Sequence, residues 1–284
     1  MLLPRILTAL VLLPLMLGML FFANAPVWAI FVGLIALIGL WEYSRLVGMP
    51  KPMWVTYIAM SAAVGFIVYR YGVRFGVVEQ IVVVIFWGAV VPLWLKFKWR
   101  LKPGFSGILV GWVLFFPFWL VLVQQRAAVD FSHGELIFTD NTKSLLAMMV
   151  LVWIADIGAY VFGRLFGKRK LAINISPGKS WEGAIGGFLC VLAYVYFIQY
   201  IGWWSFVIPV IPEPFSWALF ALVFTAISVE GDLFESWLKR SAGIKDSSHL
   251  LPGHGGVFDR VDAMVSVLSV YAAMLAFLTM WTFS

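Results

Sequence analysis

The sequence has few charged residues and almost no cysteine or histidine. Charged side chains make up 12% of its 284 residues, against about 25% in an ordinary soluble domain. Its single cysteine, Cys190, excludes a disulfide framework within the chain. The three histidines, His133, His249 and His254, do not have the spacing of zinc ligands. We therefore expect neither a disulfide-stabilised secreted domain nor a zinc protein.

Apolar residues, in contrast, are abundant. They account for 63% of the chain, and the mean hydropathy is +0.97. No soluble fold of this length has a core large enough to bury that much apolar surface, so lipid is the expected solvent. The net charge of +6 is interpreted as loop lysines and arginines that set membrane topology, not as a nucleic-acid-binding surface.

Long apolar runs recur along the whole chain. A spanning helix needs about 20 mostly apolar residues. Nine runs approach that length: 6–22, 27–43, 53–70, 77–95, 105–123, 144–163, 183–203, 215–236 and 261–282. The sequence therefore predicts an all-α integral membrane protein, a polytopic bundle of about nine transmembrane helices. Because a second apolar run follows Pro26 at once, we interpret the first two runs as a retained hairpin and not as a signal peptide.

The basic residues predict how this bundle is oriented. With nine spans and a cytoplasmic N-terminus, sixteen of the 20 lysines and arginines fall on the inner side. The outer side then holds only Arg70, Arg74, Arg126 and Lys143. This bias follows the positive-inside rule. We expect the N-terminus in the cytoplasm and the C-terminus outside.

Acidic residues gather at the same predicted face. Charged groups inside a membrane are costly, by about 2.5–3.5 kcal/mol at the centre of a helix, and usually face the interior of the bundle. Their convergence on one layer therefore predicts a functional site. The acids of this layer are Glu42, Asp156, Glu182, Glu230, Asp232, Glu235, Asp246, Asp259 and Asp262.

The two halves of the chain differ in this respect. Residues 1–143, with five predicted helices, carry few polar groups within the spans, whereas residues 144–284, with four, carry dense polar clusters. We predict a scaffold at 1–143 and a catalytic region at 144–284, joined in one continuous bundle.

The end of the eighth predicted helix carries the first polar cluster. Asp232, Glu235 and Lys239 are spaced i, i+3, i+7 and therefore share one helical face. A charged helix end near water would explain Lys239 and Arg240. It explains poorly the three acids one to two turns earlier, which are Glu230, Asp232 and Glu235. This pattern favours a site over a solvated helix end.

The loop that follows contains Gly253, His254, Gly255 and Gly256, which allow backbone amides to approach an anion. Asp259 and Asp262 then begin the last helix on one face. Turn formation and N-capping would account for part of this pattern. They do not call for two carboxylates, an arginine and a glycine-rich loop together.

The segment from Ser236 to Asp262 resembles the signature of the phosphatidate cytidylyltransferase (CDP-diacylglycerol synthase) family. The resemblance covers 27 residues without a gap, including Lys239-Arg240, Lys245-Asp246 and His254-Gly255-Gly256. Segments 156–160, 163–168 and 176–183 also resemble this family, so the likeness extends over roughly residues 150–265. The first five helices are similar only in being hydrophobic.

The resemblance implies a nucleotidyltransferase of phospholipid biosynthesis. Such an enzyme transfers a cytidylyl group from CTP to phosphatidate and releases pyrophosphate. Phosphoryl chemistry of this kind depends on positioning and on electrostatic stabilisation by metal ions and basic residues. Carboxylates suit Mg²⁺, so Mg²⁺ is the expected cofactor, with a second cation left open.

The resemblance also implies roles for individual residues. We expect catalytic contributions from Asp232, Lys239, Asp246, Asp259 and Arg260, and metal binding by Asp232, Glu235, Asp259 and Asp262. The expected substrate-binding residues are Lys179, Ser180, Arg240, Lys245, His254, Gly255 and Gly256, and the supporting acids are Asp156, Glu182 and Glu230.

Two other activities remain as alternatives. A CTP-dependent lipid kinase would transfer the γ-phosphate, and an ion-coupled secondary transporter would also have acids within its spans. The transporter is disfavoured because the acids lie at one face and not at the midplane. We expect CTP, phosphatidate and membrane lipid as partners, no nucleic acid, and a bacterial inner-membrane location with the site facing the cytoplasm. A homodimer is left open.

Overall fold

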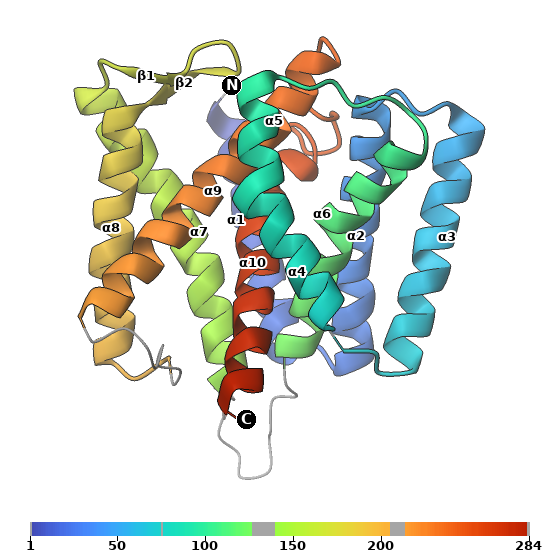
Figure 1. Ribbon diagram of the computed structural model, residues 1–284, viewed down its shortest axis with the longest axis horizontal. Coiled ribbons are helices and arrows are strands. Elements are labelled where there is room, and N and C mark those ends of the chain that lie inside the picture. Colours follow the sequence, from blue (N-terminus) through green and yellow to red (C-terminus); the bar gives the residue numbers. More distant parts are fainter. Residues whose placement is uncertain (1, 75, 127–139, 205–213, 283–284) are drawn as a thin grey trace.

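The protein is a bundle of helices that stand side by side (Figure 1). The computed structural model describes residues 2–74, 76–126, 140–204 and 214–282. Helix α1 (Leu2–Phe22) begins at the same end of the bundle as the small sheet, and α10 (Phe258–Thr282) runs to the opposite end.

Eight helical segments within the described residues are long and apolar enough to cross a membrane. This confirms the prediction of an all-α polytopic membrane protein. The first predicted run, 6–22, coincides with α1, whose described apolar part, Leu10–Phe22, is shorter than the other eight segments. Besides α10, the spans are α2 (Ala25–Leu46), α3 (Lys51–Arg70), α4 to α5 (Val77–Phe97), α6 (Phe105–Gln125), α7 (Asp140–Phe166), α8 (Trp181–Tyr200) and α9 (Phe215–Ser241).

The third of these spans contains a break that the apolar pattern does not reveal. It consists of α4 (Val77–Ile85), a π-helical turn η1 (Phe86–Val90) and α5 (Val91–Phe97). Pro92 has no N–H for the carbonyl four residues earlier, and the N–H of Val91 bonds the carbonyl of Phe86, five residues back. The rings of Phe86, Trp87 and Trp94 then meet Phe234 of α9 edge to face.

A short antiparallel hairpin joins α7 to α8 and contains the only two strands among the described residues. Strand β1 (Lys170–Ala172) pairs with β2 (Ser176–Ser180), with Lys170 opposite Ser180. No pattern in the sequence predicted these strands. The hairpin lies at the end of the bundle where α9 ends and α10 begins (Figure 1).

Glycines bring α7 and α8 into close contact. A Cβ atom at Gly183 would lie 2.7 Å from the carbonyl oxygen of Ala159, and one at Gly187 would lie 2.9 Å from that of Ala155. Small residues allow such backbone approach between membrane helices. The packing sets α7, which carries Asp156, close against α8.

The same device joins α9 to α10. A Cβ at Gly231 would lie 2.3 Å from Ser266 Oγ and 2.9 Å from the carbonyl oxygen of Asp262. Ser266 Oγ donates to the carbonyl of Ile227 across the two helices at 2.9 Å. This contact brings Asp232 and Asp262 to one interface.

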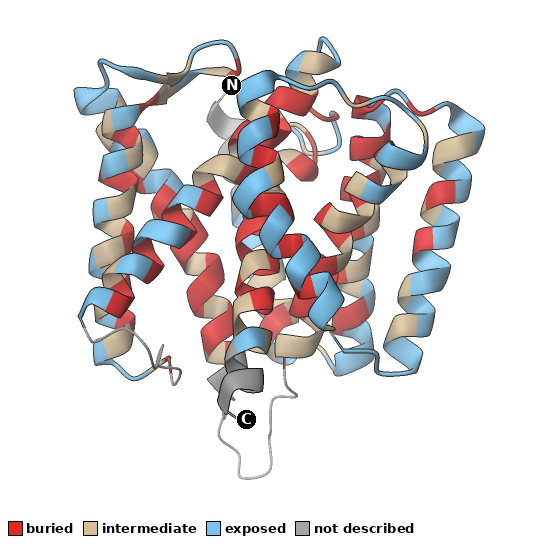
Figure 2. Ribbon diagram, in the orientation of Figure 1, coloured by how far each residue is buried: buried red, intermediate tan, exposed pale blue. Residues whose placement is uncertain are grey.

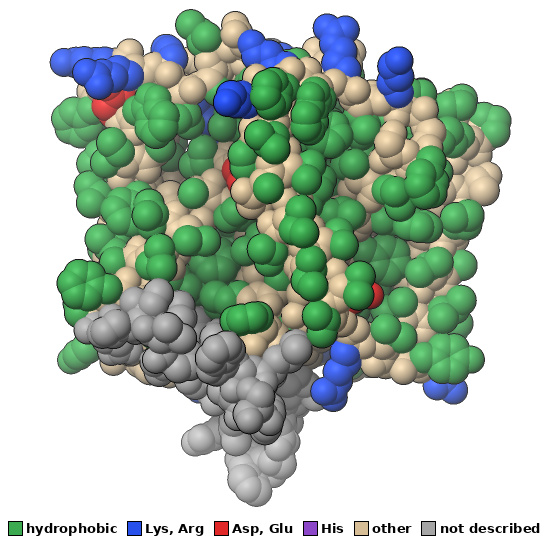
Figure 3. Space-filling model, viewed as in Figure 1, with side chains coloured by type: hydrophobic (Ala, Val, Ile, Leu, Met, Phe, Trp, Pro, Cys, Tyr) green, Lys and Arg blue, Asp and Glu red, His purple; other side chains and the backbone are tan. Residues whose placement is uncertain are grey.

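The surface has the distribution expected of a protein in lipid. Most of α3 is exposed, whereas the centre of the bundle is buried (Figure 2). Hydrophobic side chains cover the flank in view, and lysines and arginines gather mainly at the end that carries the hairpin (Figure 3). A soluble protein would not expose an apolar band of this extent, because monomeric soluble proteins rarely expose contiguous apolar patches above a few hundred Å².

Candidate active site

The predicted site residues meet at the hairpin end of the bundle, where β2, α9, the loop 242–257 and α10 converge. The first group centres on Lys179 of β2. Its Nζ lies 2.7 Å from Asp232 Oδ2 on α9 and 3.5 Å from the carbonyl oxygen of Val229, to which it donates. Asp156 and Asp262 both interact electrostatically with Asp232 and with Lys179. Three carboxylates from three helices therefore lie within electrostatic range of one lysine.

A second group lies nearer the end of α9. Lys239 Nζ is 2.6 Å from Glu235 Oε2 and 2.6 Å from Asp259 Oδ1. Lys239 follows Asp232 by seven residues, which is about 10 Å along a helix axis. The side chains of Glu235 and Asp259 are 1% and 5% exposed, so Lys239 pairs with two buried acids at once.

Asp259 is also held by the loop that precedes it. Its Oδ2 accepts the N–H of Ser247 at 2.9 Å, the hydroxyl of Ser247 at 2.8 Å and the N–H of Gly256 at 2.7 Å. A Cβ at Gly255, where φ is +84°, would lie 2.7 Å from the same oxygen. The glycines thus let the loop wrap an aspartate of the protein itself. Their predicted contact with a triphosphate stays a prediction.

Glu42, on α2, was among the acids of the inner layer but was not predicted as a site residue. Its carboxylate is fully buried and accepts the N–H groups of Val257 at 3.0 Å and Phe258 at 2.6 Å. The hydroxyl of Ser248 also donates to it, and that of Ser247 lies 3.2 Å away. An acid within an apolar run was the only signal that could have singled it out.

The remaining predicted residues fall into local roles or on the surface. Ser180 is the N-cap of α8 and accepts the N–H of Gly183, and Glu182 accepts the N–H groups of Lys168 and Arg169. Arg240 Nε donates to the carbonyl of Ile175 at 3.3 Å, and Arg260 Nε donates to that of His254 at 3.1 Å. Lys245 and Asp246 are exposed on the loop.

A cavity of about 640 Å³ adjoins the first group. It lies among α5, the hairpin, α8 and α9, and its lining is mainly apolar. Glu230 lines it and has a buried Oε1 without a hydrogen-bond partner. Val229, whose carbonyl accepts from Lys179, forms part of the wall. The cavity is therefore separated from the Lys179–Asp232 pair by one residue of α9.

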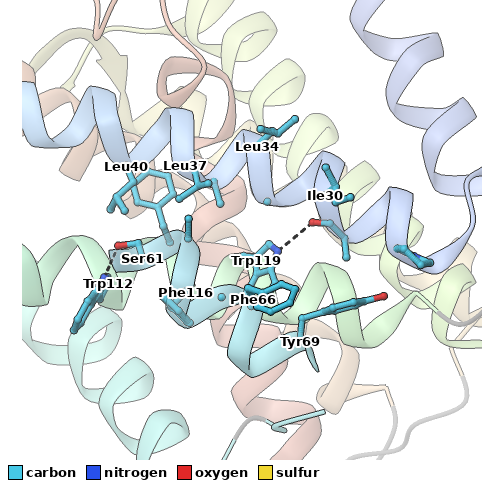
Figure 4. Close-up of a pocket in the computed structure, with 17 residues that line it drawn as sticks. Ile30, Leu34, Leu37, Leu40, Ser61, Phe66, Tyr69, Trp112, Phe116 and Trp119 are labelled. Atoms are coloured by element: carbon cyan, nitrogen blue, oxygen red, sulfur yellow. Dashed lines mark hydrogen bonds between the residues drawn. The ribbon is translucent and has the colours of Figure 1, made fainter. Parts of the chain in front are cut away.

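A second cavity, of about 430 Å³, lies among α2, α3 and α6 (Figure 4). Both of its tryptophan N–H groups are satisfied within the protein, since Trp112 Nε1 donates to Ser61 Oγ and Trp119 Nε1 to the carbonyl of Ala29. None of the predicted site residues lines it. It has no groups with which to carry out chemistry on a phosphate.

The acids of the first group suit a hard divalent cation that arrives with phosphate. Among the described residues, no three His, Cys, Asp or Glu side chains form a ready metal site. Mg²⁺, however, commonly takes one or two carboxylates and completes its shell with water and substrate phosphates. Asp232 and Asp262, with Asp156 beside them, fit that use. Asp259 fits it less simply, because its side chain is 5% exposed against 33% for Asp232, Lys239 holds its Oδ1, and its Oδ2 already accepts three hydrogen bonds.

Comparison with known proteins adds independent information. The model of the cytidylyltransferase family matches residues 3–278. A protein of Pseudomonas aeruginosa named phosphatidate cytidylyltransferase is 38% identical over 283 residues, which cover 95% of this chain and 96% of the relative. A protein of the same name from Haemophilus influenzae is 32% identical over 286 residues, covering 94% and 96%. A third, from Brucella suis, is 40% identical over 138 residues, about half of each chain.

Proposed function

This chain belongs to the cytidylyltransferase family, and we propose that it transfers the cytidylyl group of CTP to phosphatidate, forming CDP-diacylglycerol and pyrophosphate. The observation that carries the proposal is the meeting of Lys179, Asp232, Asp156 and Asp262 at one end of a membrane bundle, next to an apolar cavity. Such a site has acids for a cation, bases for phosphate and space for lipid.

The reaction joins two polyanions. A phosphate oxygen of phosphatidate forms a bond to the α-phosphorus of CTP, and the bond from that phosphorus to the bridging oxygen of the β-phosphate breaks. The electron pair leaves with pyrophosphate. Because the attacking phosphate is already ionised near neutral pH, the protein needs no strong base. Its task is to hold the reactants in line and to offset their charge.

The basic residues of the site are suited to that task. Lys179 lies at the junction between the acids and the cavity, and Arg260 also interacts electrostatically with Asp156. Arg240 and Lys245 are exposed nearby on the same end of the bundle, where a soluble nucleotide can approach. We assign phosphate binding to these four residues.

Mg²⁺ would be held by Asp232 and Asp262, and it would supply positive charge for the triphosphate. Asp156 would add negative charge to the same site. We assign Asp259 and Glu235 a different role from the predicted metal binding: both acids hold Lys239 in one position. These two contacts fix the orientation of the Lys239 side chain at the end of α9, just before the loop 242–257.

The cavity beside Glu230 is assigned to the lipid. Its lining accepts the glycerol and the first part of the acyl chains, and Val229 separates it from Lys179 by a single residue. A phosphate attached to lipid in this cavity would therefore meet Lys179. The unpartnered Oε1 of Glu230 marks the polar end of the cavity.

We further assign the site to the cytoplasmic face of a bacterial inner membrane. The lysines and arginines that gather at this end of the bundle support the assignment through the positive-inside rule (Figure 3). CTP would then reach the site from the cytoplasm while phosphatidate stays in the inner leaflet.

Product analysis tests the proposal. The purified chain is incubated with phosphatidate, Mg²⁺ and CTP labelled at either the α- or the γ-phosphate. Label from the α position in the lipid product supports cytidylyl transfer. Label from the γ position alone would indicate a lipid kinase, and no turnover together with solute flux in vesicles would indicate a transporter.

A further inference from the structure

Glu42 joins the first half of the chain to the loop of the candidate site. It lies near the end of α2, and its side chain is 0% exposed. Its carboxylate contacts two pairs of groups: the hydroxyls of Ser247 and Ser248, of which only that of Ser248 donates to it, and the N–H groups of Val257 and Phe258, which both donate to it. These pairs stand near the two ends of the loop segment 247–258. One carboxylate therefore closes that segment.

Because Glu42 is buried, its carboxylate and the groups around it must all keep their hydrogen-bond partners. A buried carboxylate is costly unless hydrogen bonds compensate its charge, and a buried donor that loses its acceptor also costs free energy. Space is limited as well, since a Cβ at Gly256 would lie 2.0 Å from Ser247 Oγ and 2.4 Å from Glu42 Oε1. The loop and Glu42 fit each other closely.

Ser247 connects Glu42 to Asp259. Its hydroxyl lies 3.2 Å from Glu42 Oε2 and 2.8 Å from Asp259 Oδ2, and its N–H also donates to Asp259. Asp259 in turn holds Lys239. A continuous chain of contacts thus runs from α2 through one serine to the charged centre of the site.

We infer that Glu42 is a positioning residue for the transfer reaction, which sets Asp259 and Lys239 through the hydroxyl of Ser247. The inference rests on the proposed function for its kinetic readout. It also has a consequence that can be measured without substrate: Glu42 holds the loop segment 247–258 closed. Glutamine at position 42 would direct N–H groups toward donors, and aspartate would be one methylene too short to reach both ends of the loop.

The test compares Glu42→Gln, Glu42→Asp, Ser247→Ala and the double variant Glu42→Gln/Ser247→Ala in the full chain. Glu79→Gln is the control, because Glu79 is an exposed acid at the start of α4. At a temperature well below each variant's Tm, we expect kcat to fall at least tenfold in Glu42→Gln and less in Glu42→Asp, with a smaller change in KM for CTP. The double variant should be no slower than Glu42→Gln alone, because both substitutions interrupt one path.

Trypsin cleavage after Lys245 supplies a readout that needs no activity. An open loop should be cut about tenfold faster in Glu42→Gln and unchanged in Glu79→Gln. If wild type makes no product but Glu42→Gln still speeds cleavage, the proposed function fails while loop closure by Glu42 holds. Unchanged cleavage, or a lower Tm with an unchanged kcat, would overturn the inference. Should Glu42→Gln fail to insert, Ser248→Ala removes one of the donors to Glu42 and should change both readouts in the same direction.

Discussion

Lys179 of β2 and Asp232 of α9 lie 2.7 Å apart and join the short hairpin to the helix that carries the acidic cluster. Both side chains are partly exposed, at 23% and 33%, so the pair is open to a substrate and not sealed as a structural ion pair. Exposed pairs of this kind contribute little to stability. We therefore expect substitutions of Lys179 to affect catalysis more than folding.

Lys179→Met should lower kcat/KM for CTP about 100-fold, the lower end of the range for loss of one preorganised charged donor. Lys179→Arg keeps the charge and should retain most of that activity. Tm should change little in either variant. Steady-state kinetics with thermal unfolding will decide the matter, and a large loss of Tm in Lys179→Met would mean that the lysine is mainly structural.

Lys239→Met should chiefly affect stability. The substitution leaves Glu235 and Asp259 buried without their common cation, and removing one partner of a buried pair costs about 3–5 kcal/mol. Adding Glu235→Gln removes one of the stranded charges and should restore part of the Tm without restoring turnover. Equal stability of the single and double variants would contradict this account of Lys239.

Asp259→Asn should abolish measurable turnover while membrane insertion stays intact. The amide replaces one accepting oxygen with a donor, which must face either Lys239 or the N–H groups of Ser247 and Gly256. Product formation and the amount of protein in the membrane fraction are the two measurements. Activity near the wild-type level in Asp259→Asn would refute any part for this carboxylate in the site.

Filling the cavity between α8 and α9 should impair the use of lipid. Ala226 lines it, and Ala226→Phe should raise KM for phosphatidate several-fold with little change in KM for CTP. The matched control is Ala62→Phe, which fills the separate cavity among α2, α3 and α6. If both substitutions change KM for phosphatidate equally, the lipid does not occupy the cavity beside Glu230 in particular.

The spacing of residues along α9 predicted some contacts of the site and not others. The i, i+3, i+7 spacing of Asp232, Glu235 and Lys239 predicted a shared face, and Lys239 does contact Glu235 directly. The spacing could not reveal that Asp232 instead pairs with Lys179, because that partner comes from a hairpin far away in the sequence. The acids form two groups because Lys179 pairs with Asp232, whereas Lys239 pairs with Glu235.

The sequence by itself determined that the protein is a helical membrane bundle with nine of its 14 acids gathered in one layer. Both properties depend on local quantities: the length of an apolar run measured against a bilayer, and the position of each charge within its run. The tertiary structure alone decided the hairpin that carries Lys179, the π-helical turn before Pro92 and the burial of Glu42 against the loop. Each of these depends on which distant groups satisfy a buried charge or an unpaired backbone group, and no local pattern contains that information.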